Sequence, residues 1–320
     1  MYDALLLISF GGPESHDDVI PFLENVLRGR NVPRERMLAV AEHYYHFDGR
    51  SPINRQCRDL ITALAPLVPL PIYWGNRNWH PMLPDTVRKM KEQGVKRALA
   101  IATSAFGSYS GCRQYREDIE KSGAEFPIDK VPPYWNHPGF IEAMADNVRV
   151  ALAKLPGAEV VYTAHSIPVS MAQASPYEQQ LRAAAQMVNR QVGLVDQGKE
   201  PVFAYQSRSG PPTQPWLDPD IGDYIRQTSS KRLIVVPIGF LSDHMEVLYD
   251  LDLEAADLAR ERGIEFIRAA TAGTHPKFVA GLADVVQNAL ANGITSCPAD
   301  CCQPGVRPGA RPASPASRPL

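Results

Sequence analysis

Short apolar runs alternate with longer amphipathic stretches along most of this chain, and this alternation restricts the fold more than any other feature of the sequence. In the first part of the chain, strand character is found at residues 3–10, 70–74 and 96–103. Helical spacing of apolar residues is found at residues 14–27, 36–47, 84–92 and 112–121. Such alternation is typical of parallel sheets that helices cover on both faces, so we expect an α/β fold.

The same alternation begins again after a proline-rich segment at residues 132–138, which we interpret as a linker. Two Rossmann-like (flavodoxin-like) lobes, each with a parallel sheet, and a cleft between them are therefore expected. We expect residues 1–135 to form the first lobe and residues 136–275 the second, with a C-terminal helix at 276–295 joining the first lobe. Residues 296–302 then form a cysteine-rich segment, and the Pro-, Arg- and Ser-rich residues 303–320 a disordered tail.

Composition and charge argue against several classes of protein. The net charge of −2 gives no sign of nucleic acid as a partner. No apolar run reaches the roughly 18 residues that a membrane-spanning helix needs, so we expect no membrane insertion. The N-terminus has strand character and lacks the basic start of a signal peptide, which favours a cytoplasmic protein and argues against a two-lobed periplasmic binding protein.

One strand–loop–helix stretch places charged residues where open α/β sheets bind ligands. The predicted strand at 233–236 is followed by a helix that Ser242 or Asp243 is expected to cap. A histidine, His244, lies at the start of this helix. Carboxylates recur along one face of it, at Glu246, Asp250 and Glu254. A solvated acidic face is the alternative, but the position after a strand and the neighbouring histidine favour a functional site.

A second candidate is His165, which follows the predicted strand at 159–163. A histidine that titrates near neutrality can accept a proton and release it again. A structural role is the commoner one for a lone histidine, but the strand-end position that it shares with Glu246 favours a functional role. The neighbouring Ser166 does not indicate a serine hydrolase, because no Gly-x-Ser-x-Gly motif is present.

Loop residues of the first lobe and scattered aromatic residues suit a flat, anionic ligand. Arginine and tyrosine can hold carboxylates, and they occur here at Arg30, Arg50, Arg113, Arg116, Tyr44, Tyr45 and Tyr109. Any one of these arginines, taken alone, is interpreted as an ordinary surface residue. Aromatic residues at strand ends and in loops are core residues by default, but together they would form a slot for a planar ligand: Phe10, Phe106, Phe240, Trp74, Trp79, Trp135 and Trp216.

Over residues 3–290 the chain resembles the ferrochelatases, and among them the actinobacterial coproporphyrin III ferrochelatase type. The motifs that carry this resemblance lie at residues 5–14, 49–53, 108–115, 163–168, 205–211 and 237–246. The resemblance implies a chelatase-type fold and an enzyme of heme biosynthesis that inserts Fe²⁺ into coproporphyrin III, giving coproheme and two protons. Protoporphyrin IX as substrate, a cobalt or nickel tetrapyrrole chelatase, and a non-catalytic heme or coproheme carrier stay open as alternatives.

The resemblance also implies residue roles. His165 takes pyrrole protons or ligates the metal, Glu246 is its partner across the cleft, and Asp250 and Glu254 extend an acidic path for metal or protons. Many bacterial relatives carry a tyrosine where this chain has Phe10, which rules out a phenol ligand to iron on that face. A family arginine that contacts a propionate aligns with His43. Porphyrin-binding residues are expected at Phe10, Tyr44, Arg50, Ser51 and Tyr109.

The charged residues 28–40 replace the apolar lip that dips into a membrane in animal enzymes. A soluble enzyme suits coproporphyrin, whose four carboxylates offer more anchors to arginine and tyrosine than the two of protoporphyrin. The expected partners are thus coproporphyrin III and ferrous iron. We expect a monomer, open to transient contact with neighbouring enzymes of the heme pathway.

Five cysteines are present, and three of them fall within residues 297–302. In a reducing compartment such a group indicates metal more than disulfides. Together with one mid-chain cysteine they supply the four thiolates of a [2Fe–2S] cluster: Cys112, Cys297, Cys301 and Cys302. Related actinobacterial enzymes carry such a cluster with the same distribution of ligands. A labile thiol-rich tail is the alternative, and Cys57 is interpreted as a small core residue.

Overall fold

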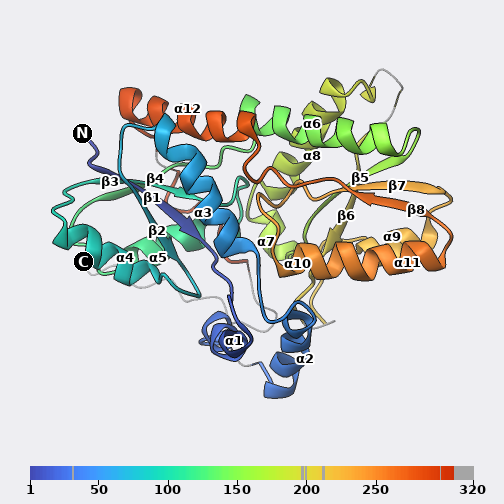
Figure 1. Ribbon diagram of the computed structural model, residues 1–320, viewed down its shortest axis with the longest axis horizontal. Coiled ribbons are helices and arrows are strands. Elements are labelled where there is room, and N and C mark those ends of the chain that lie inside the picture. Colours follow the sequence, from blue (N-terminus) through green and yellow to red (C-terminus); the bar gives the residue numbers. More distant parts are fainter. Residues whose placement is uncertain (31, 196–197, 199, 211–212, 296, 306–320) are drawn as a thin grey trace, which may run out of the picture.

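A computed structural model describes residues 1–30, 32–195, 198, 200–210, 213–295 and 297–305. The expected α/β architecture is confirmed, with two four-stranded parallel sheets in the described part of the chain (Figure 1). The first sheet has the order β2 (Ile72–Asn76), β1 (Ala4–Ser9), β3 (Ala98–Ala102) and β4 (Ile128–Lys130). The second has the order β6 (Val202–Gln206), β5 (Glu159–His165), β7 (Arg232–Val236) and β8 (Glu265–Arg268).

The central strands are buried on both faces. Every residue of β1 and β3 is buried, as expected for a parallel strand that helices cover on both sides. β4 was not predicted, because its three residues, Ile-Asp-Lys, are half-buried at the sheet edge and give no apolar run. The strands bring their carboxyl ends to one edge of each sheet, where His165 ends β5.

Helices follow the strands in nearly the predicted order. Those of the first half are α1 (Val19–Leu27), α2 (Arg34–Tyr45), α3 (Ile53–Leu64), α4 (Leu83–Glu92) and α5 (Gln114–Lys121). Those of the second half are α6 (Pro138–Lys154), α7 (Val169–Gln173), α8 (Tyr177–Gln191), α9 (Ile221–Gln227), α10 (Met245–Val247), α11 (Ala256–Glu261) and α12 (Pro276–Asn292). Helix α1 begins later than expected, because a 3-10 turn occupies His16–Asp18.

The two sheets share one hydrophobic core. Helices α12 and α6 follow one another along the top of Figure 1, α12 above the first sheet and α6 above the second, and they are in contact with each other. Leu7 and Ile101 of the first sheet belong to the same buried cluster as Tyr162 and Val236 of the second. The proline-rich connection is also part of this core, because Tyr134 is buried and donates its hydroxyl to the carbonyl of Ala102 at 2.7 Å.

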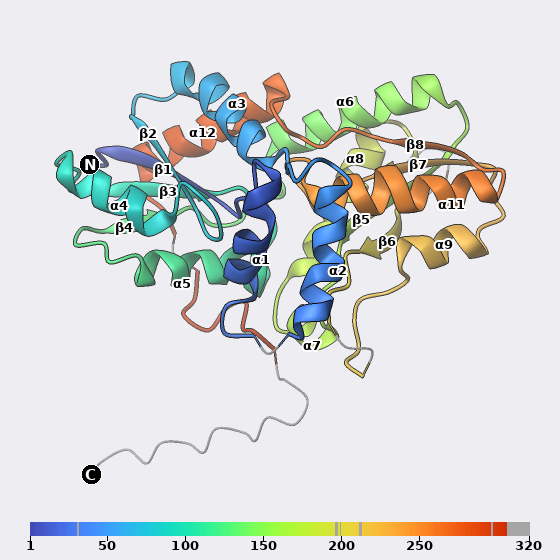
Figure 2. The same ribbon diagram turned by 60° about the horizontal axis from the view of Figure 1, so that its bottom comes forward.

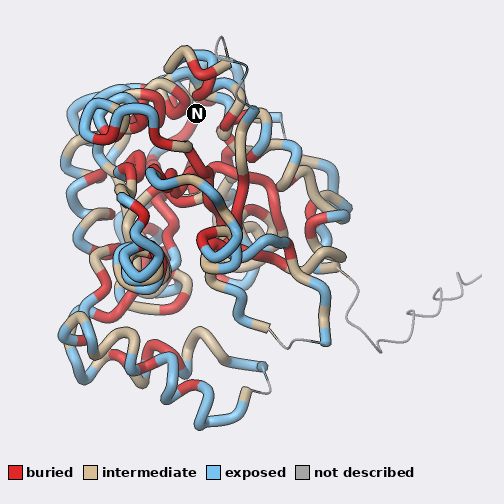
Figure 3. The backbone as a smooth tube through the Cα atoms, turned by 90° about the vertical axis from the view of Figure 1, so that its right-hand side faces the viewer, coloured by how far each residue is buried: buried red, intermediate tan, exposed pale blue. Residues whose placement is uncertain are grey.

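Helices α1 and α2 form a hairpin apart from the rest of the fold (Figures 1 and 2). Its small apolar core contains Val19, Phe22, Leu23, Met37 and Ala41. Much of its surface is exposed, in contrast to the buried strands above it (Figure 3). Within the described ranges, no helix has both the length and the apolar character to cross a membrane. The tail predicted at 303–320 lies outside the described residues from 306 onward.

Candidate active site

The structure brings His165 and Glu246 together. His165 is the last residue of β5, and Glu246 lies in the first turn of the helix after β7, the neighbouring strand. The His165 Nε2 and Glu246 Oε1 atoms are 3.6 Å apart, with 28% and 43% of the two side chains exposed. On the other side of the ring, Nδ1 lies 2.5 Å from the carbonyl oxygen of Ser166. Since a carbonyl only accepts, Nδ1 carries a hydrogen and Nε2 is the atom that can take up a proton.

A close approach of two backbone segments sets this geometry. The loop after β7 runs across the end of β5, and the Gly239 amide donates to the carbonyl of Thr163 at 3.1 Å. A side chain at Gly239 would place its Cβ 2.6 Å from the Cβ of Ala164, the residue before His165. The glycine therefore lets the loop carrying Glu246 approach the strand carrying His165.

The predicted helix cap is wrong. Helix α10 begins at Met245, and His244 is its N-cap, accepting from the Glu246 amide through Nδ1 at 3.2 Å. The Asp243 carboxylate is unavailable for capping because Arg268 donates to it at 3.0 Å. Ser242 likewise lies too early in the loop to cap this helix. His244 thus supports the backbone of Glu246, and its Nδ1 lies 3.9 Å from the Glu246 carboxylate.

The acidic face continues along a π-helical segment, Leu248–Ala255. Asp250 accepts a hydrogen bond from Ser207, which adopts a left-handed backbone conformation with φ +62°. Burial raises the pKa of Asp250 to about 7, and the charges of Glu246 and Glu254 act in the same direction. Glu246 and Asp250 are half-buried and Glu254 is exposed, so the row of three carboxylates leads from the interior toward solvent.

His165 and Glu246 stabilise each other's charged form. Burial is the largest single influence on His165 and would lower its pKa, but the charge of Glu246, the hydrogen bonds to Glu246 and Ser166 and the charge of Asp250 together raise it. Burial would likewise raise the pKa of Glu246, but the charges of His165 and His244 and a hydrogen bond from His165 lower it to about 2. Each residue therefore favours the charged form of the other, which is the condition for an ion pair at this point.

Aromatic side chains from β1 and the hairpin lie near these acids. Phe10 follows β1, is 37% exposed and meets Phe22 edge-on, with ring centroids 6.2 Å apart. Tyr44 packs on the same Phe22 ring, at 5.6 Å. Burial raises the pKa of Tyr44, and the charges of Glu246 and Asp250 contribute, so its phenol lies within electrostatic range of the acidic face.

Helix α2 contacts the second sheet's side of the molecule at two points. The rings of His43 and Tyr249 stack with centroids 3.7 Å apart and an interplanar angle of 6°. Arg36 donates to the carbonyl of Ser209 at 2.8 Å. These contacts hold the hairpin against the acidic segment.

The other predicted porphyrin-binding residues have contacts or exposure of their own in the structure. Tyr109 donates its hydroxyl to Glu117 at 3.1 Å, Ser51 is buried beside Gly12, and Arg50 is exposed. Among the aromatic residues, Phe106 is 2% exposed and is a core residue that packs on Phe140 and Tyr177. Its proposed place in a ligand slot is therefore wrong.

A cavity lies between the two sheets, but it is separate from the pair. Its lining is mostly apolar and includes Leu7, Gln56, Tyr134, Ser242 and Phe278. Neither His165 nor Glu246 lines it. This cavity belongs to the shared core.

The four cysteines predicted as cluster ligands lie next to one another. Cys112 lies in a π-helical turn before α5 and accepts a hydrogen bond from the Cys302 thiol. Cys301 forms hydrogen bonds with both Cys297 and Cys302. The bond from Cys302 lowers the pKa of Cys112 to about 6, helped by Lys130, whose Nζ lies 3.3 Å from the Cys112 sulfur. All five cysteines are free thiols, and no group of three or more His, Cys, Asp or Glu side chains in the described ranges is arranged to hold a metal ion.

Two arginines considered as carboxylate ligands have another role. Arg113 donates to the carbonyl oxygens of Ala299 at 2.7 Å and Cys301 at 3.0 Å. Arg116 also reaches Ala299, at 3.4 Å. Both side chains therefore fasten the cysteine-rich segment to the first sheet's side of the molecule, which accounts for them without a ligand.

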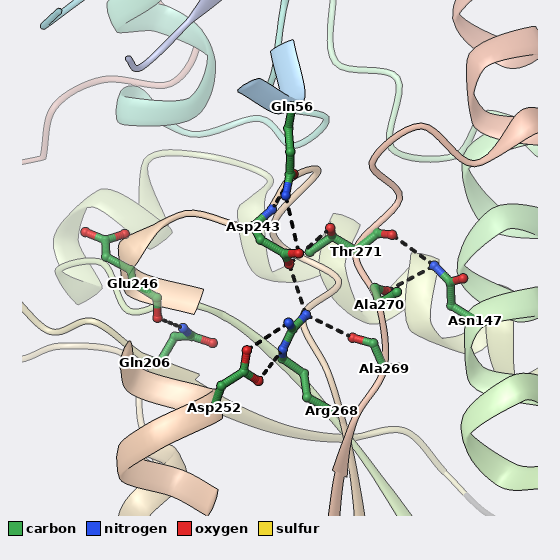
Figure 4. Close-up of polar contacts among 10 residues, drawn as sticks. All are labelled: Gln56, Asn147, Gln206, Asp243, Glu246, Asp252, Arg268, Ala269, Ala270 and Thr271. Carbon is green, nitrogen blue, oxygen red and sulfur yellow. Dashed lines mark hydrogen bonds and ion pairs between the residues drawn. The ribbon is translucent and has the colours of Figure 1, made fainter. Parts of the chain in front are cut away.

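Some contributors were missed in the sequence. Gln206, at the end of β6, donates Nε2 to the Glu246 carbonyl at 2.7 Å (Figure 4), and its buried Oε1 has no hydrogen-bond partner in the described structure. Its position inside the motif at 205–211 was the available signal. Arg268 and Gln56, which both contact Asp243, gave no signal, because neither lies in a recognised motif.

Comparisons with known proteins agree with this geometry. The model of the ferrochelatase family matches residues 2–290. A ferrochelatase of Rhodopirellula baltica is 54% identical, over 94% of this chain and 93% of its own. Coproporphyrin III ferrochelatases of Frankia alni and Streptomyces coelicolor are 47% and 48% identical, over 94% and 89% of this chain and 87% and 84% of their own.

Solved chelatase structures share the fold. SirB from Bacillus subtilis with Fe³⁺ aligns with a TM-score of 0.57 at 11% identity, over 91% of this chain and 97% of its own. CbiX, from siroheme biosynthesis in denitrifying bacteria, aligns with a TM-score of 0.55 at 15% identity, over 89% of this chain and 99% of its own. Since the family match spans both sheets and includes His165 and Glu246, this chain belongs to the ferrochelatase family.

Proposed function

We propose that this metal chelatase inserts Fe²⁺ into coproporphyrin III and releases coproheme and two protons, as a step of heme biosynthesis. The observation that carries the proposal is the ion pair of His165 and Glu246 at the ends of two neighbouring parallel strands, beside further acids. Relatives named as coproporphyrin III ferrochelatases cover most of the chain.

The pair can serve both halves of the reaction. Carboxylate and imidazole bind Fe²⁺ loosely enough to pass it on to a better ligand. Once iron neutralises Glu246, the proton on His165 loses its partner and leaves, so Nε2 becomes free to accept a pyrrole proton. The hydrogen bond from Nδ1 to Ser166 keeps Nε2 directed toward Glu246 throughout.

The remaining acids offer these protons a way out. Asp250 titrates near neutrality because burial raises its pKa to about 7, so it can accept and release a proton under working conditions. Glu254, one turn further, is exposed and passes the proton to solvent. We propose the order His165, Asp250, Glu254, since the charge of Asp250 acts on His165 while Glu246 is occupied by iron.

The macrocycle is proposed to bind between the hairpin and this acidic face. Phe10 and Tyr44 supply apolar contact for the ring. Arg50, Ser51 and Tyr109 are proposed to hold propionates. Binding energy from these remote contacts offsets the strain of a bent macrocycle, on the order of 1–5 kcal/mol, and bending exposes the nitrogen lone pairs to iron.

Coproporphyrin III is favoured over protoporphyrin IX by the surface of the hairpin. Arg28, Arg30, Arg34 and Arg36 are exposed on or beside α1 and α2. A cationic surface suits a substrate with four carboxylates. We place the protein in the cytoplasm as a monomer that meets neighbouring heme-pathway enzymes transiently.

Replacing His165 by alanine tests whether the protein is an enzyme or a carrier. Porphyrin binding, followed by quenching of its fluorescence, should change less than threefold, because the imidazole contacts only part of the ring. Iron insertion should fall by about 10²–10⁴-fold, the range for loss of a general base. Unchanged insertion would contradict the proposal, and a wild-type protein that binds porphyrin without inserting iron would favour the carrier.

We further propose that Cys112, Cys297, Cys301 and Cys302 hold a [2Fe–2S] cluster. Four adjacent thiols, one of them with a lowered pKa beside Lys130, are the donor set that such a cluster requires. When bound, the cluster cross-links the C-terminal segment and can exchange one electron. Anaerobically purified protein should contain about two iron and two sulfide per chain, and Cys302→Ser should lose both while Cys57→Ser keeps them. Equal metal content in both variants would contradict the assignment.

A further inference from the structure

A half-buried arginine holds the acidic helix at two points. The side chain of Arg268, at the end of β8, is 15% exposed. It donates to Asp243 through Nη1 at 3.0 Å, and to both carboxylate oxygens of Asp252, at 2.5 and 2.9 Å (Figure 4). Asp243 precedes Glu246 and Asp252 follows it, so one guanidinium fixes the chain on both sides of Glu246.

Asp243 is also held from the other lobe. Gln56, on α3 beside the first sheet, accepts from the Asp243 amide at 2.8 Å and donates to its carboxylate at 3.4 Å. The Thr271 hydroxyl completes the set at 3.3 Å. Figure 4 shows these groups converging on Asp243 from α3, from the end of β8 and from the segment after it.

The arrangement links the first sheet's side of the molecule to the reacting pair. Glu246 has its own carbonyl fixed by Gln206, and three residues earlier its chain is fixed by Gln56 and Arg268. Neither Gln56 nor Arg268 contacts the carboxylate of Glu246 or the ring of His165 in the described structure. Any effect of Gln56 on the chemistry must therefore pass through Asp243, and any effect of Arg268 through Asp243 or Asp252.

We propose that Gln56 and Arg268 are positioning residues that hold Glu246 opposite His165, Gln56 through Asp243 and Arg268 through both Asp243 and Asp252. This inference rests on the proposed function only for its kinetic readout. A displacement of about 1 Å at a reacting group can cost roughly a hundredfold in rate without weakening substrate binding. The structure thus assigns to Asp243 the role of a junction between α3 and the metal-binding helix.

Kinetics of Arg268→Gln, Gln56→Met and Asp243→Ala provide the first test. We expect kcat for iron insertion to fall about tenfold or more in each variant, with the porphyrin Kd unchanged within twofold. Gln56→Met should lower kcat by less than twofold when Asp243 is already alanine, because its route to Glu246 is then absent. Arg268→Lys should recover only part of the loss, since lysine lacks the fork that reaches both carboxylates.

The control is Arg232→Gln. Arg232 pairs with Glu265 at 2.9 Å on the same two strands, at their opposite end, and this variant should keep kcat within twofold. If the losses of kcat in Gln56→Met and Asp243→Ala multiply in the double variant, the proposal is overturned. It is also overturned if these variants raise KM and leave kcat unchanged.

Crystal structures give a readout that does not depend on activity. Asp243→Asn and Gln56→Met are milder changes, which can be used even if Arg268→Gln does not fold. In both variants the distance from His165 Nε2 to the Glu246 carboxylate should exceed the ion-pair limit of about 4 Å. A distance equal to that of the wild type in both variants would overturn the positioning role. Absence of iron insertion by the wild type would instead count against the proposed function alone.

Discussion

His165 has one ring nitrogen bound to the protein and one left for chemistry. Its Nδ1 is fixed by the Ser166 carbonyl, while Nε2 faces Glu246 at 3.6 Å. The sequence placed each of these residues after a predicted strand, and the family resemblance paired them. The structure adds that the two strands, β5 and β7, are neighbours in one sheet. The sequence could not predict the tautomer or the pKa values, which depend on a carbonyl, on burial and on charges contributed by other segments.

Asp250 leads to a prediction at the same scale. Its pKa is raised to about 7 from an ordinary value near 4, so the native protein binds its proton more tightly than the unfolded chain does. The charged form is thus unfavourable, and stability from this group falls as pH rises from about 4 to about 7. Asp250→Asn should raise the free energy of unfolding by on the order of 1–3 kcal/mol at pH 8 and have little effect at pH 4.

Thermal or denaturant unfolding at pH 4 and pH 8 measures the difference in free energy of unfolding between Asp250→Asn and the wild type. The same variant should lower kcat at pH 8, because one step of the proton route is missing. Glu261→Gln, at an exposed carboxylate on α11, is the matched control and should leave stability nearly unchanged. Equal stability of Asp250→Asn and wild type at pH 8 would contradict the raised pKa.

At the scale of elements, apolar runs located the central strands well, because β1 and β3 are buried throughout. The three-residue edge strand β4 was missed because its Asp and Lys interrupt any apolar pattern. One helix was expected to carry Glu246, Asp250 and Glu254, but the structure has a π-helical segment, Leu248–Ala255, between α10 and α11. The spacing of side chains in the sequence hardly distinguishes an α-helix from a π-helix, because residues four apart lie close together in both.

Gly239 supports a prediction at the scale of the loop. In the sequence it indicated only the end of a strand, but its Cα faces Ala164 so closely that a Cβ would lie 2.6 Å away. Gly239→Ala should therefore move the loop away from β5, destabilise the protein by about 1–3 kcal/mol and lower kcat more than tenfold. Gly263→Ala, in open space, is a control for the added methyl group, although its φ of +64° adds some strain. Activity of Gly239→Ala within twofold of wild type would show that this contact does not position Glu246.

The stacked rings of His43 and Tyr249 give a second prediction for the elements. They hold α2 against the acidic segment, beside the surface where the porphyrin is proposed to bind. Tyr249→Ala should remove this contact and increase the association rate of coproporphyrin severalfold, measured by stopped-flow fluorescence, with kcat less affected. Tyr224→Ala, on α9, serves as a control. A slower association in Tyr249→Ala would indicate that the stack forms part of the binding surface.

At the scale of the whole molecule, the alternation of strands and helices predicted two parallel sheets, and both are present. How they share a core could not be read from it. One buried cluster contains Leu7 of the first sheet, Val236 of the second and Phe278 of α12. Such contacts join residues far apart in the chain, and no local pattern indicates them. The anchoring of the C-terminal segment by Arg113 is of the same kind.

The most direct test of this account is anaerobic turnover with Fe²⁺, in which coproporphyrin III and protoporphyrin IX are supplied in parallel and metalation is followed by absorbance. We predict that coproheme forms at least tenfold faster, as kcat/KM, than protoheme. Faster formation of protoheme would contradict the substrate assignment and leave the chelatase intact. Tight binding of both porphyrins without insertion of iron into either would contradict the central claim itself.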